Sequence, residues 1–279
     1  MSVSLSNVDQ TEFDAMVKKA YQSGGFLLRN TVRLRENVEG KTVSFRKVGS
    51  VQALQYSFQS QVLYQDPNYN KADATLLPYR APTLVDDMEQ WLYNFDEKME
   101  DAELIAMALG RRHDQIIINA LNASGTANTI AEGSTNLTYA KVREVNKFFN
   151  KLAVPREERY FAISADGEEK LLDEDKFTNS RYVDLNLVKT GSLDGNFAMG
   201  MNWIVIPEMA EGGLPLSGTI RSCFAWHKKS MGMAIGRQMR TIIERVPTLD
   251  SWQILGKTFA GAIAVDAVGI IKCDIDESA

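Results

Sequence analysis

The stretch at residues 94–125, NFDEKMEDAELIAMALGRRHDQIIINALNASG, carries the clearest structural pattern in the sequence. Its apolar residues recur with helical spacing: Met99, Leu104, Ile105, Ala108, Leu109, Ile116, Ile117, Ala120 and Leu121. Asn94 is a candidate N-cap with Glu97 three residues later, and Gly125 supplies a stop signal. The predicted helix of about 28 residues spans roughly 40 Å and would act as the spine of the fold.

The segment before this helix alternates in polarity, which is typical of a strand. LQYSFQSQVLY (54–64) places Leu, Tyr, Phe and Val residues on one face and Gln and Ser on the other. QDPNYNKADA (65–74) predicts a turn-rich tip, and TLLPYRAPTLV (75–85) a returning segment whose Pro78 and Pro82 favour a sheet edge. Residues 40–83 therefore predict a long hairpin arm. Because a two-stranded hairpin is marginal alone in water, we expect it to lie on a partner subunit.

The remaining chain mixes helices and strands. A helix is predicted over residues 9–36, with a break at Gly24 and Gly25, and another over 138–151, starting at Thr138. Shorter patterns predict strands at RYFAIS (159–164), NWIVIP (202–207), GTIRSCFAWHK (218–228) and RTIIERV (240–246), and a helix at ADGEEKLL (165–172). We therefore predict an α+β fold.

The composition excludes several broad classes of protein. The 279 residues carry a formal charge of −5, which disfavours a dedicated nucleic-acid binder because such domains are usually basic. The polar start MSVSLSNVDQTEFDA has no signal-peptide pattern, and no apolar run approaches the ~20 residues of a membrane helix. We expect an intracellularly made, soluble protein without a membrane partner, in which Cys223 and Cys273 are buried free thiols.

The residues needed for catalysis or metal binding do not converge in the sequence. Neither His113 nor His227 has a neighbouring carboxylate placed to orient it as a proton shuttle. No His/Cys spacing suits zinc, and the acidic clusters DEDKF and DIDESA lack the pattern of a calcium loop. We predict no catalytic residue, no metal site and no cofactor.

The tripeptide Gly256-Lys257-Thr258 matches the end of a phosphate-binding loop. The full motif requires a glycine where this chain has Ser251, and bulky residues such as Trp252 and Leu255 fill the interior of the would-be loop. The residues that follow predict a strand and turn, whereas a phosphate loop opens a helix. An α+β enzyme that uses this region for phosphate therefore stays a minor alternative.

Charge is unevenly distributed along the chain. Residues 16–50 contain eight Lys or Arg and two Glu, whereas residues 84–103 contain eight Asp or Glu and one Lys. One interpretation is two solvated faces. The other is that the basic arm of one molecule lies over the acidic start of another molecule's spine helix, which would set register and partner choice. The predicted self-assembly interface comprises Arg29, Arg33, Arg35, Tyr56, Phe58, Tyr64, Asp86, Asp87 and Glu89.

The order of these elements resembles the major capsid proteins of tailed bacteriophages, the Hong Kong 97-type fold that also occurs in herpesviruses and encapsulins. The resemblance rests on TVSFRKVGSVQALQYSFQSQ (42–61), on the stretch from DDMEQWLYNF into the spine helix (86–121), and on the C-terminal stretch from CFAWHKKSMGMAIG to GAIAVDAVGIIKCDI (223–275). It implies an N-terminal arm (1–38), an extended loop (39–83), a peripheral domain (84–154 plus 238–279) and an axial domain (155–237).

The resemblance also implies local roles in the C-terminal part. The small residues at 229–236 would form a helix, and residues 256–258 a strand-to-turn corner. Gly261 and Ala262 would permit close backbone approach, and His227 would be a packing residue at a strand end. Cross-linking through Lys71 at the arm tip is disfavoured, because no carboxylate can be matched to the catalytic one.

The function that the resemblance implies is structural. Pentamers and hexamers of the chain would close into an icosahedral shell that encloses double-stranded DNA without sequence-specific binding. Because the chain begins directly with the arm, we expect any scaffolding protein to be separate, with a portal and a cement or decoration protein as further partners. The location would be the virion, after assembly in the host bacterial cytoplasm. The rival with the same fold is an encapsulin-like compartment with enzyme cargo.

Overall fold

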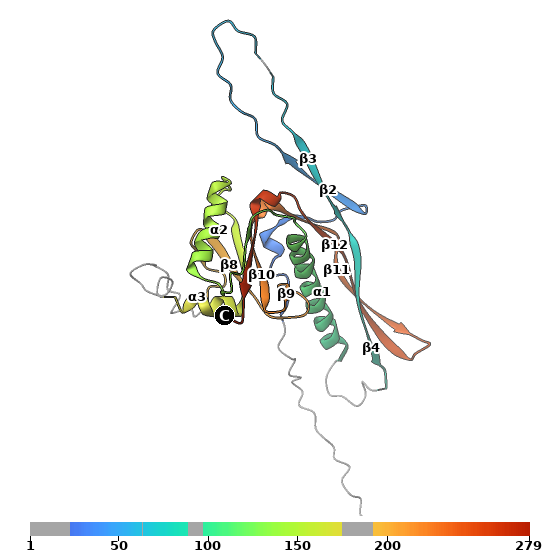
Figure 1. Cartoon of the computed structure of the whole chain (residues 1–279). Coiled ribbons are helices and arrows are strands. Elements are labelled where there is room, and N and C mark those ends of the chain that lie inside the picture. The colour runs from blue at the N-terminus through green and yellow to red at the C-terminus, as the bar shows by residue number, and fades with distance from the viewer. Residues whose placement is uncertain (1–22, 63, 89–96, 175–191) are drawn as a thin grey trace, which may run out of the picture.

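The computed structural model describes residues 23–62, 64–88, 97–174 and 192–279. In this part of the chain a long helix and two sheets form a body, from which a two-stranded hairpin projects (Figure 1). Glu89, the predicted cap Asn94 and the start of the helix predicted over 9–36 lie outside the described residues. No helix within the described ranges is both long and apolar enough to cross a membrane.

The predicted spine helix is confirmed as α1, Glu97–Asn122, which has 26 residues. Its buried residues Ile105 and Leu109 pack toward Gly256 of strand β12 (Ser251–Ala264). A Cβ on Gly256 would lie 2.2 Å from Cγ2 of Ile105, so a glycine is required for the helix to lie this close to the strand.

The sheet beneath α1 has four strands in the order β1-β11-β12-β4. β4 hydrogen-bonds to β12 and forms an edge of this sheet, as Pro78 and Pro82 indicate, because proline lacks the N–H that a central strand needs. β1 runs parallel to β11, and the other neighbours are antiparallel. The other three strands of this sheet are β1 (Arg33–Arg35), β11 (Met231–Val246) and β4 (Leu77–Asp86).

Two expectations for the C-terminal part are wrong. Residues 256–258 lie in the middle of β12, which pairs with β4 on one side and β11 on the other, and they form no corner. The small residues at 229–236 enter β11 at Met231, after a short 3-10 turn η3 (Lys228–Ser230), and form no helix. The backbone of this segment pairs with β1 and β12, and that pairing outweighs the weak helical preference of glycine-containing sequence.

The second sheet contains seven strands and carries the largest part of the core. The order is β5-β13-β10-β6-β8-β7, and β9 pairs with β10. Its strands are β5 (Thr129–Ile130), β6 (Arg159–Ser164), β7 (Phe197–Ala198), β8 (Met201–Ile206), β9 (Leu216–Ser217), β10 (Ile220–His227) and β13 (Ile270–Asp276). The short turn η4 (Ala267–Gly269) precedes β13. The strands predicted at 159–164, 202–207 and 218–228 are thereby confirmed.

Two helices pack with this sheet, and both begin at the predicted positions. α2 (Tyr139–Lys151) is capped by Thr138, whose side chain accepts a hydrogen bond from the backbone N of Lys141 at 3.4 Å. α3 (Ala165–Leu172) is capped by Ser164 in the same way. α2 buries Val142, Val145 and Phe149 in the core of the second sheet.

The hairpin differs from its prediction. Its paired strands are β2 (Thr42–Val48) and β3 (Tyr69–Thr75), and β4 belongs to the body. The described residues from 49 to 68 contain no strand, so the strand predicted at 54–64 is wrong. Figure 1 shows this part of the hairpin projecting away from the body, so the alternating pattern has no surface of the described chain on which to pack. Its described apolar side chains are exposed.

The helix predicted over 9–36 is wrong in its described part. Residues 29–31 form a 3-10 turn, η1 (Arg29–Thr31), and β1 follows directly. The backbone N–H groups of Leu27 and Leu28 donate to the carboxylate of Asp114 on α1. Tertiary hydrogen bonds thus take the donors that a local helix would have used.

The sulfhydryl groups and His227 match their predictions. Cys223 and Cys273 are free, buried and directly opposite each other on β10 and β13. Burial raises the pKa of the Cys273 thiol to about 12 and raises the pKa of Cys223 as well, so both are inert thiols. His227 ends β10 and is buried, and its Nδ1 accepts from the backbone N of Lys229 at 3.1 Å.

The close approach at Gly261 generates a prediction about the hairpin base. A Cβ at this position would lie 2.1 Å from the backbone O of Thr75, at the end of β3. We expect Gly261→Ala to lower the free energy of unfolding by about 1–3 kcal/mol, because the backbone must shift to relieve the overlap. Urea unfolding measures this, with Gly24→Ala as the control, since a Cβ there meets nothing within 4 Å. Equal stability of the two variants would contradict the prediction.

Candidate assembly surfaces

The base of the hairpin is fastened to the body by an aromatic contact and an ion pair. Phe45 on β2 is fully buried in a small apolar cluster with Ala234 of β11. The guanidinium groups of Arg33 and Arg35 lie 5.8 and 5.5 Å from the centre of the Phe45 ring. Lys47 Nζ lies 2.7 Å from Asp266 Oδ1. Two arginines predicted for assembly therefore also stabilise the hairpin base within the chain.

The projecting part of the hairpin exposes a row of large apolar side chains. Phe58 and Tyr64 are 103% and 92% exposed, and Tyr56 is 41% exposed. Five further residues of the hairpin add to this surface: Val48, Val51, Leu54, Val62 and Tyr69. A concentration of exposed apolar groups on one projection is typical of a protein–protein contact surface. The three aromatic residues predicted from the sequence belong to it.

The N-terminal segment is held by the middle of α1, which the sequence did not reveal. The two carboxylate oxygens of Asp114 accept hydrogen bonds from the backbone N atoms of Leu28 and Leu27, at 3.0 and 3.1 Å. Burial raises the pKa of Asp114, and the backbone hydrogen bonds oppose that shift. A Cβ on Gly110 would lie 2.5 Å from Gly24 O, so a glycine lets the segment cross the helix here. The available signal was an acidic residue about two turns before the end of a predicted helix and next to a histidine.

His113 links α1 to β12 next to this crossing. Its Nε2 lies 3.2 Å from Thr258 Oγ1, and its ring meets Phe26 edge-on with the ring centres 5.2 Å apart. Burial and the nearby charge of Arg29 lower the pKa of His113 to about 4. The side chain is therefore neutral at pH 7 and joins helix, sheet and N-terminal segment.

Two of the predicted acidic residues, Asp86 and Asp87, lie where β4 ends. Asp87 Oδ1 accepts from Trp252 Nε1 at 2.8 Å, and its Oδ2 lies 3.3 Å from Nη2 of Arg245. Asp86 is exposed and accepts a hydrogen bond from the backbone N of Met88. Arg29 forms an ion pair with Glu36 within the N-terminal segment.

The structure does not bring the predicted arginines and acids together within one chain. Arg33 and Arg35 lie on β1, and Asp86 ends β4, so β11 and β12 separate the two groups. A pairing of these groups can therefore form only between copies. It stays a prediction.

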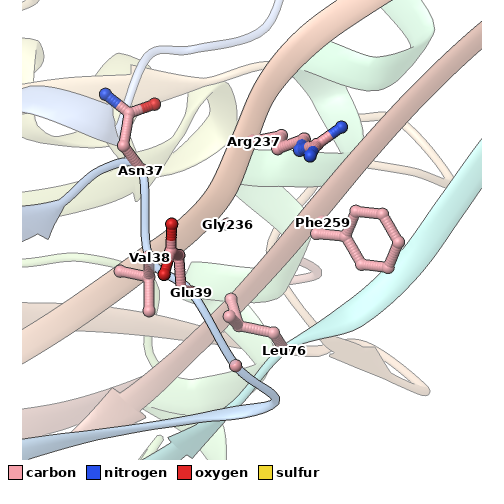
Figure 2. A pocket seen from close by; sticks show the side chains of 8 residues that line it. Asn37, Val38, Glu39, Leu76, Gly236, Arg237 and Phe259 are labelled. Atoms are coloured by element: carbon pink, nitrogen blue, oxygen red, sulfur yellow. The ribbon is translucent and has the colours of Figure 1, made fainter.

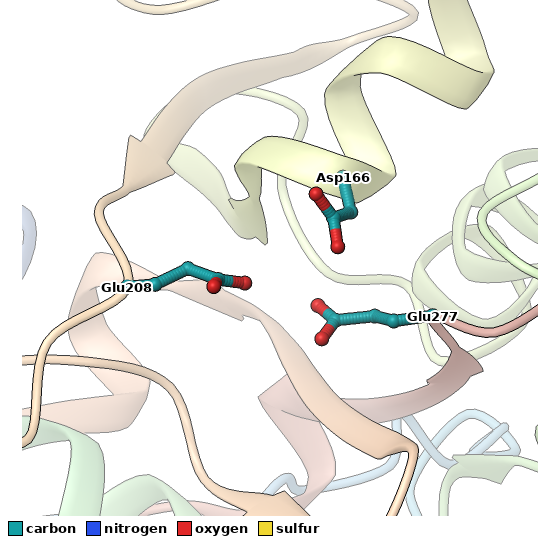
Figure 3. Close-up of side chains that lie close together, drawn as sticks. All are labelled: Asp166, Glu208 and Glu277. Carbon is teal, nitrogen blue, oxygen red and sulfur yellow. The ribbon is translucent and has the colours of Figure 1, made fainter.

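A cluster of three carboxylates near the C-terminus includes two that pair with a buried arginine, Arg221. Oxygens of Asp166, Glu208 and Glu277 lie within 4.8 Å of one another (Figure 3). Nη2 of Arg221 lies 2.5 Å from an oxygen of Glu208, and its Nε lies 2.5 Å from an oxygen of Glu277. The arginine balances part of the negative charge and ties β10 to the end of the chain, so the arrangement is that of a structural ion network.

Comparisons with known proteins agree with this architecture. The sequence model of the family described as phage capsid protein matches residues 5–277. A search of the curated proteins finds no match.

Solved capsid structures share the fold at low sequence identity. The head structure of Helicobacter pylori bacteriophage KHP40 has a TM-score of 0.80 at 10% identity, covering 99% of this chain and 100% of that chain. Mycobacterium phage Che8 has a TM-score of 0.75 at 16% identity, covering 96% and 97%. The capsid of cyanophage P-SCSP1u has a TM-score of 0.72 at 14% identity, covering 95% and 92%. The α+β, Hong Kong 97-type fold predicted from the sequence is thereby confirmed.

The depressed pKa of His113 predicts an acid-sensitive body. Between the unfolded value of about 6.5 and the folded value of about 4, the unfolded chain binds a proton that the folded chain does not, so stability falls as the pH falls. We expect the unassembled protein to lose about 2 kcal/mol more between pH 7 and pH 5 than its His113→Gln variant. Urea unfolding at both pH values measures this. Asp114 titrates in both proteins and cancels. Equal losses would show that His113 is not responsible.

Proposed function

This chain belongs to the phage capsid protein family, and on that premise we propose that its copies close into an icosahedral shell around the double-stranded DNA genome of a tailed phage. The protein is a structural component of the capsid. A shell of this kind uses the same surfaces many times, so each contact can be moderate while the whole is stable.

The projecting hairpin is the observation that carries this proposal. It leaves the body at Phe45 and exposes Tyr56, Phe58 and Tyr64 beyond the last paired residue, Val48. Phe58 and Tyr64 have almost no cover from the described residues of their own chain, and burying the Phe58 side chain would contribute about 1.5–3 kcal/mol. The body of a neighbouring copy supplies that surface in the proposed shell.

In the proposed capsid subunit, the four segments predicted from the sequence form separate structural parts. Residues 1–38 form the arm, 39–83 the extended loop, 84–154 plus 238–279 the peripheral domain, and 155–237 the axial domain. Strand β13 from the C-terminal segment pairs with β10 of the proposed axial domain, so the two domains share a sheet. A shared sheet favours a rigid body with motion confined to arm and loop.

The proposed partners beyond further copies follow from the same function. Copies would gather as pentamers and hexamers, with a scaffolding protein, a portal and a cement or decoration protein as further partners. The net charge of −5 suits a lining that encloses DNA without gripping it, because strong phosphate contacts would oppose its release. Assembly would take place in the cytoplasm of the host bacterium. The encapsulin-like compartment and the phosphate-binding enzyme are not favoured by the family match.

Removing the aromatic side chains of the hairpin tests its role. We expect Tyr56→Ser with Phe58→Ser to leave folded subunits but few closed shells, because the Phe58 ring alone contributes about 1.5–3 kcal/mol at every copy of the contact and the Tyr56 ring adds its exposed part. Light scattering and negative-stain electron microscopy measure closed particles. Gln55→Ser with Gln61→Ser is the matched control in the same loop. Shells from the aromatic variant in normal yield would show that the hairpin is not an assembly element.

The predicted charge pairing between copies has its own test. We expect Arg35→Glu to weaken assembly more than Arg35→Gln, because both lose the contact with Phe45 and the glutamate variant alone repels Asp86. Asp86→Lys should then restore assembly of the Arg35→Glu variant and not that of Arg35→Gln. The yield of closed particles is the readout. Absence of this selective rescue would exclude the pairing. Asp87 is left unchanged because it already holds Arg245 and Trp252.

A further inference from the structure

The face of the four-stranded sheet opposite α1 carries a row of cations. Gly256 faces α1, so its neighbour Lys257 points to the other side of the sheet, because successive residues of a strand alternate. Lys257 is directly opposite Arg80 on β4 and Arg240 on β11. Three like charges therefore follow one another across three adjacent strands, an arrangement that destabilises a sheet when nothing offsets it.

These cations surround a cavity. A hollow of about 350 Å³ is lined by Arg80, Arg240 and Lys257 and by a fourth cation, Arg237. The register of β11 against β12 shifts on both sides of Arg237, and these irregularities place its side chain beside the row. The other lining residues are Pro78, Tyr79, Thr258 and Phe259.

Negative charge is scarce around this cavity. No acidic residue of the described chain lines it, and none of the four cations forms an ion pair with a described residue. The adjoining cavity of about 510 Å³ shares Arg237 and Phe259 and contains Glu39, which Figure 2 shows on the opposite side from these two residues. This one carboxylate lies across the adjoining cavity from Arg237, so among the described residues the charges of the other three cations stay unbalanced.

We propose that Arg80, Arg237, Arg240 and Lys257 form a binding site for a phosphate-type oxoanion on this face of the sheet. Arginine presents a planar fork of donors that matches the oxygens of a phosphate, and lysine adds a mobile point charge. The ligand would replace the missing counter-charge across the three strands. The chemistry is that of a phosphate group, supplied either as a free anion or by the backbone of a nucleic acid.

The proposed site uses the Gly256-Lys257-Thr258 segment in a different way from the phosphate-binding loop whose last three residues it matches. A phosphate loop binds through backbone N–H groups, but those of β12 are engaged with its neighbouring strands. Here Lys257 acts through its side chain together with arginines from two other strands. The proposed anion site does not depend on shell assembly, so it can be tested independently of the proposed function.

Thermal unfolding of the full chain in inorganic phosphate tests the site. Against chloride at equal ionic strength, phosphate should raise the Tm in a saturable manner, because a ligand of the folded state stabilises it. Lys257→Gln and Arg240→Gln should each weaken the apparent affinity by about tenfold, the scale of one charge-assisted hydrogen bond. Without phosphate they should unfold at a Tm equal to or above that of the parent, since like-charge repulsion is relieved.

The control is Lys147→Gln, which removes an exposed lysine from α2 on the other sheet and should leave the phosphate response unchanged. If Lys147→Gln lowers the apparent affinity for phosphate as much as Lys257→Gln does, the effect is general charge screening and the proposal is wrong. A Tm response that does not saturate with phosphate would also overturn it.

A second experiment identifies the source of the phosphate group. A short DNA duplex that competes with phosphate at the same residues identifies a nucleic-acid backbone as the source, and failure to compete identifies a free anion. If the parent protein does not bind phosphate and Lys257→Gln impairs shell formation, the cations pair with carboxylates of a neighbouring copy. That outcome would overturn the oxoanion site.

Discussion

At Gly256, the side chains of Ile105 and Leu109 on α1 pack directly on the backbone of β12, because the strand has no side chain of its own there. Thr258, two residues further along β12, reaches His113 on the helix. Asp114, which follows His113 on α1, accepts hydrogen bonds from the backbone of the N-terminal segment. A larger side chain at Gly256 would separate helix and sheet, and the buried contact between Thr258 and His113 depends on that separation staying small.

The charges of the molecule are divided between internal and outward roles. Arg221 holds two carboxylates near the C-terminus, and Arg33 and Arg35 flank the ring of Phe45. These cations stabilise the body and the hairpin base. The cations around Lys257 have no such partner among the described residues. Their charges are therefore available to a ligand, whereas those of Arg221, Arg33 and Arg35 already stabilise the fold.

The elements predicted correctly are those whose sequence pattern and tertiary surroundings agree. The spine helix has a long apolar stripe, Thr138 is a cap with a helix behind it, and Pro78 and Pro82 restrict β4 to an edge. The errors fall where the two disagree. Residues 54–64 alternate like a strand but have no partner strand among the described residues, whereas residues 231–236 join β11 because strands pair with it on both sides.

The sequence by itself determined the α+β class, the spine helix, the exposed aromatic residues of the hairpin and the resemblance to phage capsid proteins. These follow from periodicity, caps and composition, which are local properties of the chain. Tertiary structure alone decided that Asp114 anchors the N-terminal segment and that Lys257 joins Arg80 and Arg240 across three strands. Residues from distant segments are involved in each case, and their proximity depends on strand register and helix packing, which no single segment encodes.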